Sequence, residues 1–324
     1  MTDLAAILEA NARLEGHVRR TPLLESPFLN DIAGRRVLVK PECLQHTGSF
    51  KFRGAWSAIS ALPEEQRAKG VLAYSSGNHA QGIASAARAH GIPAVIIMPD
   101  NAPTLKLENT RALGAEVVTY DRAGGESREA IGTKIANERG LTLIRPYDEP
   151  VVIAGQGTTG LEIAAQATEM GIITAEVLVC CGGGGLTSGI ALALEGKAPD
   201  MTVRPVEPQG FDDVARSLRA GTIQSNASQV GLCDAILTPQ PGALTFPIMH
   251  RLCGAGIAVS DIEALDAMAQ AFLRLKIVAE PGGAVALAAA LYHGDELDAD
   301  TVIAVVSGGN VDPVVFGRAL ARLG

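Results

Sequence analysis

Short apolar segments alternate with helix-like segments along nearly the whole chain of 324 residues. The expected helices include 77–91 and 102–114, and the expected strands are 36–40, 70–75, 93–99, 115–120, 176–181, 202–207 and 301–307. Strands and helices that alternate in this way form βαβ units, whose right-handed crossovers place helices on both faces of a parallel sheet. The sequence therefore predicts an α/β fold, in which ligands bind at the carboxyl ends of the strands.

The residues 46–145 carry a compact βαβαβ pattern of their own. We interpret them as a small domain inserted into a large domain that consists of 1–45 and 146–324, although no linker or low-complexity tract marks the boundary. Glycine-rich or polar clusters follow several expected strands, and four of them are GSFKFRGA (48–55), SSGNHAQG (75–82), CGGGGL (181–186) and SGGN (307–310). Four such loops in one α/β chain predict a single cleft shared by the two domains.

Composition narrows the range of partners. The net charge is -8 and no block of basic residues occurs, which argues against nucleic acid or an anionic membrane as a partner. The N-terminus lacks the long apolar run of a signal peptide, and no segment approaches the length of a membrane span. The five cysteines have no metal-binding or disulfide spacing, so we expect a reducing, cytoplasmic location.

The glycine run at 182–185 lies between a strand and a helix. Backbone N–H groups in such a turn, together with the helix N-terminus, form an anion site, so the run predicts a phosphate cradle. The structural alternative is a turn that only allows tight strand–helix packing. A dinucleotide fold would require G-x-G-x-x-G, whereas Gly183, Gly185 and Gly189 are spaced one residue too far apart. Because Glu207 ends the next strand, a nicotinamide-dependent oxidoreductase stays open as an alternative.

Lys51 lies near an expected helix start, between Phe50 and Phe52 and away from acids. Such surroundings lower the pKa of an amine, and a neutral amine forms a Schiff base with an aldehyde. Pyridoxal 5′-phosphate (PLP) carries both an aldehyde and a phosphate, so the lysine and the glycine run together predict this cofactor. The alternative is an exposed lysine on an ordinary amphipathic helix.

From RRTPL (19–23) to SGGNVD (307–312), the chain resembles the PLP enzymes of fold type II, and within them the threonine/serine dehydratase and serine racemase group. GSFKFRGA resembles the lysine motif of that group, SSGNHAQG its substrate and ring loop, and GGGGL its phosphate loop; AGQGT (154–158) is also similar. The resemblance implies a tryptophan-synthase-β-like architecture of two open, twisted, mostly parallel sheets flanked by helices, and a homodimer.

The resemblance also implies roles around the cofactor. Lys51 would form the covalent link, Phe50 would pack against the ring and Asn78 would bind the 3′-oxygen. Ser307 would meet the pyridine nitrogen. A carboxylate can keep this nitrogen protonated, whereas a hydroxyl cannot. The ring would then be a weak electron sink, which suits β-elimination. The phosphate would be held by the backbone of Gly182, Gly183, Gly184, Gly185 and Leu186.

Glu280 would lie near the cofactor, where a buried carboxylate could assist proton transfer. The alternative is an ordinary acid at a helix N-terminus before Pro281.

On the substrate side, Ser75, Asn78 and His79 are expected to bind the amino-acid carboxylate at a helix start. Arg128 matches an arginine of the racemases, and its alternative is a solvated helix residue.

Two residues give opposite indications about the reaction. Ser76 lies where serine racemases place their opposite-face acid/base, although a serine there is equally an ordinary N-cap. Tyr147 lies where dehydratases often carry an aromatic residue.

A divalent cation is expected on a loop of the large domain. By resemblance to the racemase-like members, the ligands would be Glu207, Asp213 and the carbonyl of Phe211, and the ion would be Mg²⁺, Ca²⁺ or Mn²⁺. The alternative is that an aspartate simply begins a helix there.

The sequence therefore predicts a PLP-dependent ammonia-lyase that converts L-threonine or L-serine into a 2-oxo acid and ammonia. The alternatives are a serine racemase with side elimination activity, and a 3-hydroxyaspartate ammonia-lyase in which Arg128 or Arg145 supplies an added cation. From different classes, a nicotinamide-dependent oxidoreductase and a non-catalytic binding protein remain. The chain ends soon after its last expected strand, so we expect no regulatory domain and a catabolic role.

Overall fold

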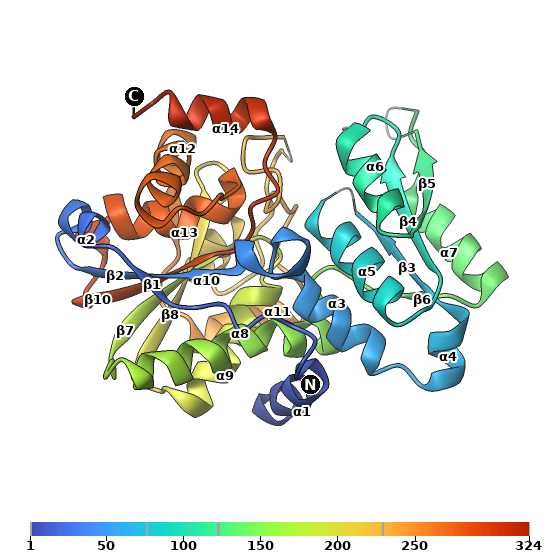
Figure 1. Ribbon diagram of the computed structural model, residues 1–324, viewed down its shortest axis with the longest axis horizontal. Helices are drawn as coiled ribbons and strands as arrows, with labels where there is room; N and C mark the ends of the chain where they lie inside the picture. The colour runs from blue at the N-terminus through green and yellow to red at the C-terminus, as the bar shows by residue number, and fades with distance from the viewer. Residues whose placement is uncertain (1, 76, 103, 122–123, 229, 324) are drawn as a thin grey trace.

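The computed structural model describes residues 2–75, 77–102, 104–121, 124–228 and 230–323. Two mostly parallel sheets, each flanked by helices, form the molecule, and this confirms the predicted α/β class (Figure 1). Among the described residues, no helix combines the length and apolarity that a bilayer span requires.

The large sheet has six strands in the order β1-β2-β10-β7-β8-β9. Strand β1 pairs antiparallel with β2, and every other neighbouring pair is parallel. The strands span β1 Leu24–Glu25, β2 Arg36–Pro41, β7 Ala175–Cys180, β8 Met201–Pro208, β9 Ile257–Val259 and β10 Thr301–Val306. Helices cover both faces, which explains why β7 and β10 are nearly continuous apolar runs.

Alternate residues of β10 reach the two faces of this sheet. Val302, Ala304 and Val306 pack in the cluster that includes α12 and α13, whereas Ile303 and Val305 pack in the cluster that includes α8 and α9. The helices of this part are α1 Leu4–Leu14, α2 Pro27–Ala33, α8 Pro150–Glu169, α9 Gly185–Lys197, α10 Asp213–Ala220, α11 Thr245–Leu252, α12 Asp261–Gln270, α13 Pro281–Tyr292 and α14 Pro313–Leu320.

The small sheet has four parallel strands in the order β5-β4-β3-β6. They span β3 Val71–Tyr74, β4 Ala94–Pro99, β5 Glu116–Tyr120 and β6 Thr142–Leu143, and the helices beside them are α4 Glu64–Lys69, α5 Asn78–Ala89, α6 Thr104–Ala112 and α7 Arg128–Arg139. All four strands lie inside the segment 46–145, whose limits as a domain stay a prediction.

Helix α3 (Lys51–Ser60) lies between the two parts of the molecule (Figure 1). It contacts α8 on one side and α5 on the other, and glycines allow both close approaches. A Cβ on Gly155 of α8 would lie 2.7 Å from the carbonyl oxygen of Arg53, and one on Gly82 of α5 would lie 3.2 Å from the Lys51 backbone.

The only tryptophan of the chain, Trp56, also lies in α3. Its ring stacks on His17, with centroids 4.1 Å apart, and lies 4.3 Å from the ring of His90.

Candidate active site

A cavity of about 760 Å³ is lined by residues from both parts of the molecule. Many of the lining residues come from the start of α3 and from loops at the carboxyl ends of β3, β7 and β10, the places where parallel α/β sheets bind ligands. The cavity thus brings together most of the residues expected from the sequence: Phe50, Lys51, Ser75, Asn78, His79, Arg128, Gly182, Gly183, Gly184, Gly185, Leu186, Glu280 and Ser307.

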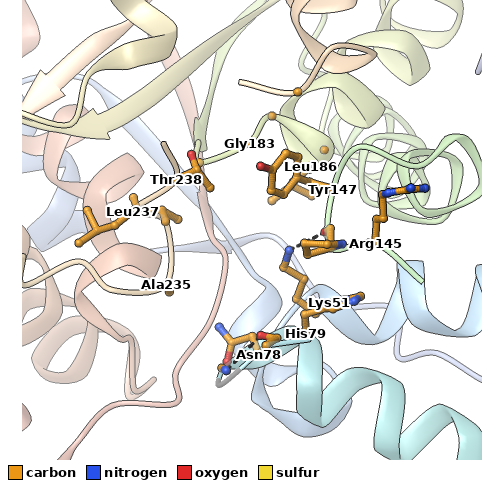
Figure 2. Close-up of a pocket in the computed structure, with 18 of the residues that line it drawn as sticks. Lys51, Asn78, His79, Arg145, Tyr147, Gly183, Leu186, Ala235, Leu237 and Thr238 are labelled. Atoms are coloured by element: carbon orange, nitrogen blue, oxygen red, sulfur yellow. Dashed lines mark hydrogen bonds between the residues drawn. The ribbon is translucent and has the colours of Figure 1, made fainter. Parts of the chain in front are cut away.

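Lys51 is the first residue of α3, and its amine lies inside this cavity (Figure 2). The Nζ atom donates a hydrogen bond to the carbonyl of Pro146 at 2.8 Å and lies 5.1 Å from the centroid of the Phe50 ring. Burial lowers the pKa of Lys51 to about 8, and the nearby Glu280 opposes this shift only in part. A substantial fraction of the amine is therefore neutral near physiological pH and can act as a nucleophile or base.

The glycine run forms the turn between β7 and α9. Gly184 adopts φ +88°, a left-handed conformation that suits glycine. There is no room for larger residues, because a Cβ on Gly183 would overlap the Tyr147 ring and one on Gly184 would lie 2.5 Å from Met249 Cε. Figure 2 shows Tyr147 beside Gly183 and Leu186.

The same region offers donors to an anion. The first backbone N–H groups of α9 have no partners within their own helix. The hydroxyl of Thr238 lines the cavity and is buried, with no hydrogen-bond partner in the described part of the chain. Donors of this kind around a glycine turn fit a phosphate group.

Asn78 is held at both ends of its side chain. Its Nδ2 donates to Glu280 Oε1 at 2.5 Å, and its Oδ1 accepts from Asn310 Nδ2 at 2.7 Å. Asn310 also donates to the carbonyl of Thr47 at 2.8 Å. Burial raises the pKa of Glu280 to about 7, although Asn78 and Lys51 favour its ionised form. Asn310 ends the SGGN cluster, but no sequence pattern indicated a role for it.

His79 is fully buried, and its Nε2 lies 3.0 Å from the carbonyl oxygen of Ile144. Burial, reinforced by Lys51, lowers the pKa of His79 to about 3, so the ring is neutral. A neutral imidazole that meets a carbonyl oxygen donates its proton, which places that proton on Nε2. The side chain therefore joins α5 to the segment after β6, and its expected contact with a substrate carboxylate stays a prediction.

The other expected substrate residues differ in their surroundings. Ser75 lines the cavity and accepts a hydrogen bond from the Gly77 amide at 3.2 Å. Ser76 lies outside the described residues. Arg128 lines the cavity with its guanidinium 5.2 Å from the centroid of the Tyr74 ring, and it pairs with Glu129 at 2.8 Å.

The residues expected to bind a cation lie at the carboxyl end of β8 and the start of α10. Glu207 accepts hydrogen bonds from the amides of Val214 and Ala215 at 2.9 and 2.8 Å. Asp213 Oδ1 accepts from Asn226 at 2.5 Å, whereas its buried Oδ2 has no partner among the described residues.

Burial acts on both carboxylates. Burial, with the charge of Asp213, raises the pKa of Glu207 well above its usual range, and burial raises that of Asp213 to about 6. The amide of Phe211, in the turn between them, donates to the carbonyl of Pro208 at 3.0 Å. Within the described ranges no group of three or more His, Cys, Asp or Glu side chains is arranged so that it could hold a metal ion. Two buried acids with a free oxygen nevertheless fit a hard cation that also takes carbonyl and water ligands.

Several cavity residues carried no recognisable signal in the sequence. The segment 234–243 lines the cavity but has no strand or helix periodicity. Lys106 of α6 pairs with Asp234 of this segment at 2.9 Å, so an ion pair connects residues 128 positions apart in the sequence.

Comparisons with known proteins identify the family of the chain. The family described as pyridoxal-phosphate dependent enzyme matches residues 14–308. L-threo-3-hydroxyaspartate ammonia-lyase from a Pseudomonas species is 43% identical over 94% of this chain and 94% of its own. Serine racemase from Arabidopsis thaliana is 40% identical over 96% of this chain and 93% of its own.

The solved structure of threonine deaminase from T.th. superposes with a TM-score of 0.89 at 44% identity, over 96% of this chain and 99% of the other. These relatives give no support to the nicotinamide-dependent oxidoreductase that the glycine spacing left open. The chain belongs to the PLP-dependent enzymes of fold type II, in the group of amino-acid ammonia-lyases and racemases.

Proposed function

We propose that this enzyme is an ammonia-lyase that removes the β-hydroxyl and the amino group of L-threonine or L-serine, leaving a 2-oxo acid and ammonia. The observation that carries the proposal is one cavity that holds a buried amine, a glycine cradle and a hydroxyl, Ser307, at the end of β10. PLP, when bound, condenses with the substrate amine and withdraws electrons from its α-carbon.

The residues of the chain would divide the work as follows. The backbone N–H groups of the glycine run and Leu186 would hold the phosphate, and Phe50 would pack against the ring. Asn78, fixed by Glu280 and Asn310, would present its amide to the ring oxygen. Lys51 would take the α-proton, because its lowered pKa leaves a neutral amine available as a base.

Ser307 would favour elimination. The Ser307 hydroxyl would lie near the pyridine nitrogen of bound PLP, where it would not supply the negative charge that keeps this nitrogen protonated, and the cofactor would then stabilise negative charge at the α-carbon only weakly. Departure of the β-hydroxyl relieves that charge at once. Glu280, with a pKa of about 7, accepts a hydrogen bond from Asn78 and feels the charge of Lys51, so its carboxyl would be able to give or take a proton within the site.

The substrate carboxylate would bind at the N-terminus of α5, where Ser75, Asn78 and His79 lie, with Arg128, which lines the same cavity, as a further partner. Ser76 is proposed as the acid of the opposite face in a racemase side reaction.

L-threo-3-hydroxyaspartate is the second candidate substrate. Three cations, Lys106, Arg128 and Arg145, line the cavity, and a substrate with a second carboxylate needs such a partner. Each now pairs with an acidic side chain, at 2.9, 2.8 and 3.5 Å respectively, for which a substrate carboxylate could substitute. Relatives 43% and 41% identical to this chain carry the name of this activity.

We also propose a divalent cation, Mg²⁺ or its substitutes Ca²⁺ and Mn²⁺, held by Glu207, Asp213 and the carbonyl of Phe211. The buried Oδ2 of Asp213, which has no hydrogen-bond partner in the described part of the chain, supports this assignment. The remaining proposals are a homodimer, a cytoplasmic location and a catabolic role. Exposed apolar side chains of the large part, such as Phe28 and Val314, support an interface between two copies.

The test begins with the visible spectrum of the purified protein. L-serine, L-threonine and L-threo-3-hydroxyaspartate are then added separately, and 2-oxo acid and D-amino acid are measured. Lys51→Ala should abolish the PLP band and turnover, while Lys134→Ala, at an exposed lysine of α7, should keep both. Release of 2-oxo acid from none of the three substrates, or D-serine as the main product, would contradict the proposal.

A further inference from the structure

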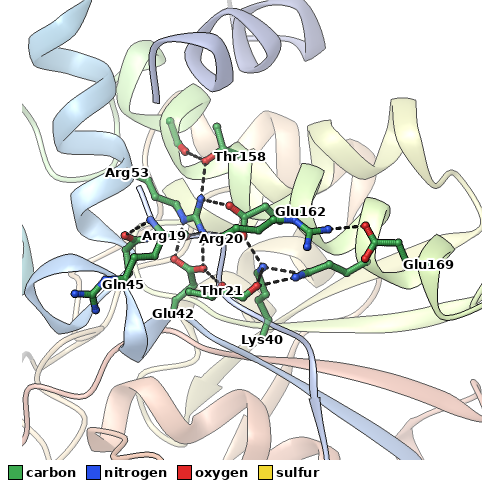
Figure 3. A network of polar contacts seen from close by, with 12 residues as sticks. Arg19, Arg20, Thr21, Lys40, Glu42, Gln45, Arg53, Thr158, Glu162 and Glu169 are labelled. Atoms are coloured by element: carbon green, nitrogen blue, oxygen red, sulfur yellow. Dashed lines mark hydrogen bonds and ion pairs between the residues drawn. The ribbon is translucent and has the colours of Figure 1, made fainter. Parts of the chain in front are cut away.

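Arg53 follows Lys51 by two residues in α3, so the two side chains leave the helix on nearly opposite sides. Lys51 lies in the cavity, whereas Arg53 is fully buried between Glu42 and Glu162 (Figure 3). With Glu42 it forms one fork, Nε to Oε2 and Nη2 to Oε1, both at 2.8 Å. With Glu162 it forms a second, Nη1 to Oε1 at 2.7 Å and Nη2 to Oε2 at 3.0 Å.

A second cation balances the charge of this cluster. Lys40 Nζ donates to Glu162 Oε2 at 2.6 Å, to Gln166 at 2.9 Å and to the carbonyl of Thr21 at 2.7 Å. Two cations and two carboxylates thus form a neutral, hydrogen-bonded group beneath the first turn of α3. We call Lys40, Glu42, Arg53 and Glu162 the Arg53 clamp.

The clamp attaches α3 to the large sheet and not to the small one. Lys40 belongs to β2, Glu42 to the 3₁₀ turn Glu42–Leu44 that follows it, and Glu162 to α8. Two further contacts, just before Lys51 in the sequence, also attach this segment to the large sheet. The Phe50 amide donates to the carbonyl of Ser307 at 3.1 Å, and Ser49 forms an isolated antiparallel bridge with Gly308.

Stability alone does not account for such a group. Buried ion pairs are costly to desolvate, and well-packed apolar residues often replace them at no loss. Two bidentate forks around one planar guanidinium instead fix both the position and the direction of the side chain. The backbone that carries Arg53 also carries Lys51, whose amine must meet the cofactor and the substrate α-carbon at bonding distance.

We propose that Arg53 is a positioning residue. Its two forks hold the first turn of α3 on the large sheet and so set the place of Lys51 Nζ relative to the glycine cradle and Ser307. Asn78 and His79, at the start of α5, have their hydrogen-bond partners in Glu280, Asn310 and Ile144, which lie outside the clamp. The kinetic part of this inference rests on the proposed function, whereas the spectroscopic part needs only bound PLP.

The test compares Arg53→Lys with Arg20→Lys. Both substitutions keep the positive charge and replace a guanidinium that pairs with a glutamate. Arg20, however, donates from Nη2 to Glu169 Oε1 at 2.7 Å on the surface, where the two side chains are 54% and 61% exposed. Circular dichroism and thermal unfolding establish that each variant is folded. The visible band of bound PLP is then followed against pH, and kcat and KM are measured with the substrate that wild type prefers.

For Arg53→Lys we expect bound PLP, a shifted pH midpoint of the visible band and a kcat lowered about 100-fold, the scale of a 1 Å misplacement, with KM changed much less. Arg20→Lys should match wild type in all three. A folded Arg53→Lys with wild-type midpoint and kcat would overturn the inference, as would a raised KM at unchanged kcat.

If Arg53→Lys does not fold, Glu162→Gln replaces it, since this side chain lies at the rim of the clamp and is 13% exposed. Glu162→Gln must then show a shifted pH midpoint of the visible band and a kcat that falls much more than KM changes. Wild-type behaviour of this variant would refute the positioning role of the clamp. If no tested amino acid is turned over, the proposed function fails, while the pH midpoint still decides whether Arg53 positions Lys51.

Discussion

Glu280 allows a quantitative test of the buried site without any substrate. Its carboxyl pKa is raised from the ordinary 4.5 to about 7, chiefly by burial, and it accepts a hydrogen bond from Asn78. Between these two pH values the folded protein keeps a proton that the unfolded chain has lost. The stability of the folded state therefore falls as pH rises through this window, by about 3 kcal/mol for 2.5 pH units.

Glu280→Gln removes this titration and keeps an oxygen that can accept from Asn78. The unfolding entropy of 324 residues is about 0.7 kcal/mol/K, so 3 kcal/mol corresponds to roughly 4 °C in Tm. We expect the Tm difference between the two PLP-free proteins, Glu280→Gln minus wild type, to increase by about 4 °C from pH 4.5 to pH 8.

Differential scanning fluorimetry across this pH range measures the difference, so that the other titrating groups cancel. Glu9→Gln, at an exposed position of α1, is the control and should give a constant difference. A Tm difference for Glu280→Gln that does not change with pH would refute the assignment of a buried carboxyl with a raised pKa.

Three further outcomes follow from the same geometry. Gly184→Ala should weaken PLP binding about tenfold, as measured by spectrophotometric titration. A left-handed alanine costs about 1–2 kcal/mol, and its Cβ would meet Met249. As a control, Gly317→Ala should bind PLP normally, because Gly317 has open space around it. In the PLP-free protein, peptide mass spectrometry can follow the rate at which Lys51 is acylated. This rate should be half-maximal at about pH 8, because only the neutral amine reacts. A rate that still rises steeply above pH 9 would contradict this expectation. Saturating Mg²⁺ should raise the Tm of wild type and leave the Tm of Asp213→Asn unchanged, because an ion that binds only the folded state stabilises that state. Equal Tm shifts in the two proteins would place the ion elsewhere.

The parts of the fold that repeat along the chain could be predicted from the sequence. Strands β7 and β10 are apolar on both faces, so each appears in the sequence as a continuous apolar run. Every strand that we expected from an apolar run is present. Strands β1, β6 and β9 have only two or three residues each, too few to show a period, and they were not predicted.

The site could be predicted where a single segment carries its signal, as with Lys51 and the glycine run. Contacts between distant segments could not. Asn310 meets Asn78 across 232 positions of sequence, and Arg53 meets Glu162 across 109. Such pairs leave no periodic pattern in one chain, because the topology alone brings them together. The ring of His79 similarly meets the Ile144 carbonyl, a partner that residue type does not indicate.

The location of Trp56 gives this protein an intrinsic optical probe. It is the only tryptophan and lies in the helix that begins with Lys51, between the rings of His17 and His90. Its emission overlaps the near-ultraviolet absorption of PLP, so energy transfer to the cofactor would quench it as the site fills. The same residue reports solvent exposure around α3, because its ring is only 6% exposed and any loosening of the helix shifts its emission to the red. One fluorescence channel thus follows both the filling of the site and the packing of its central helix, with no label attached.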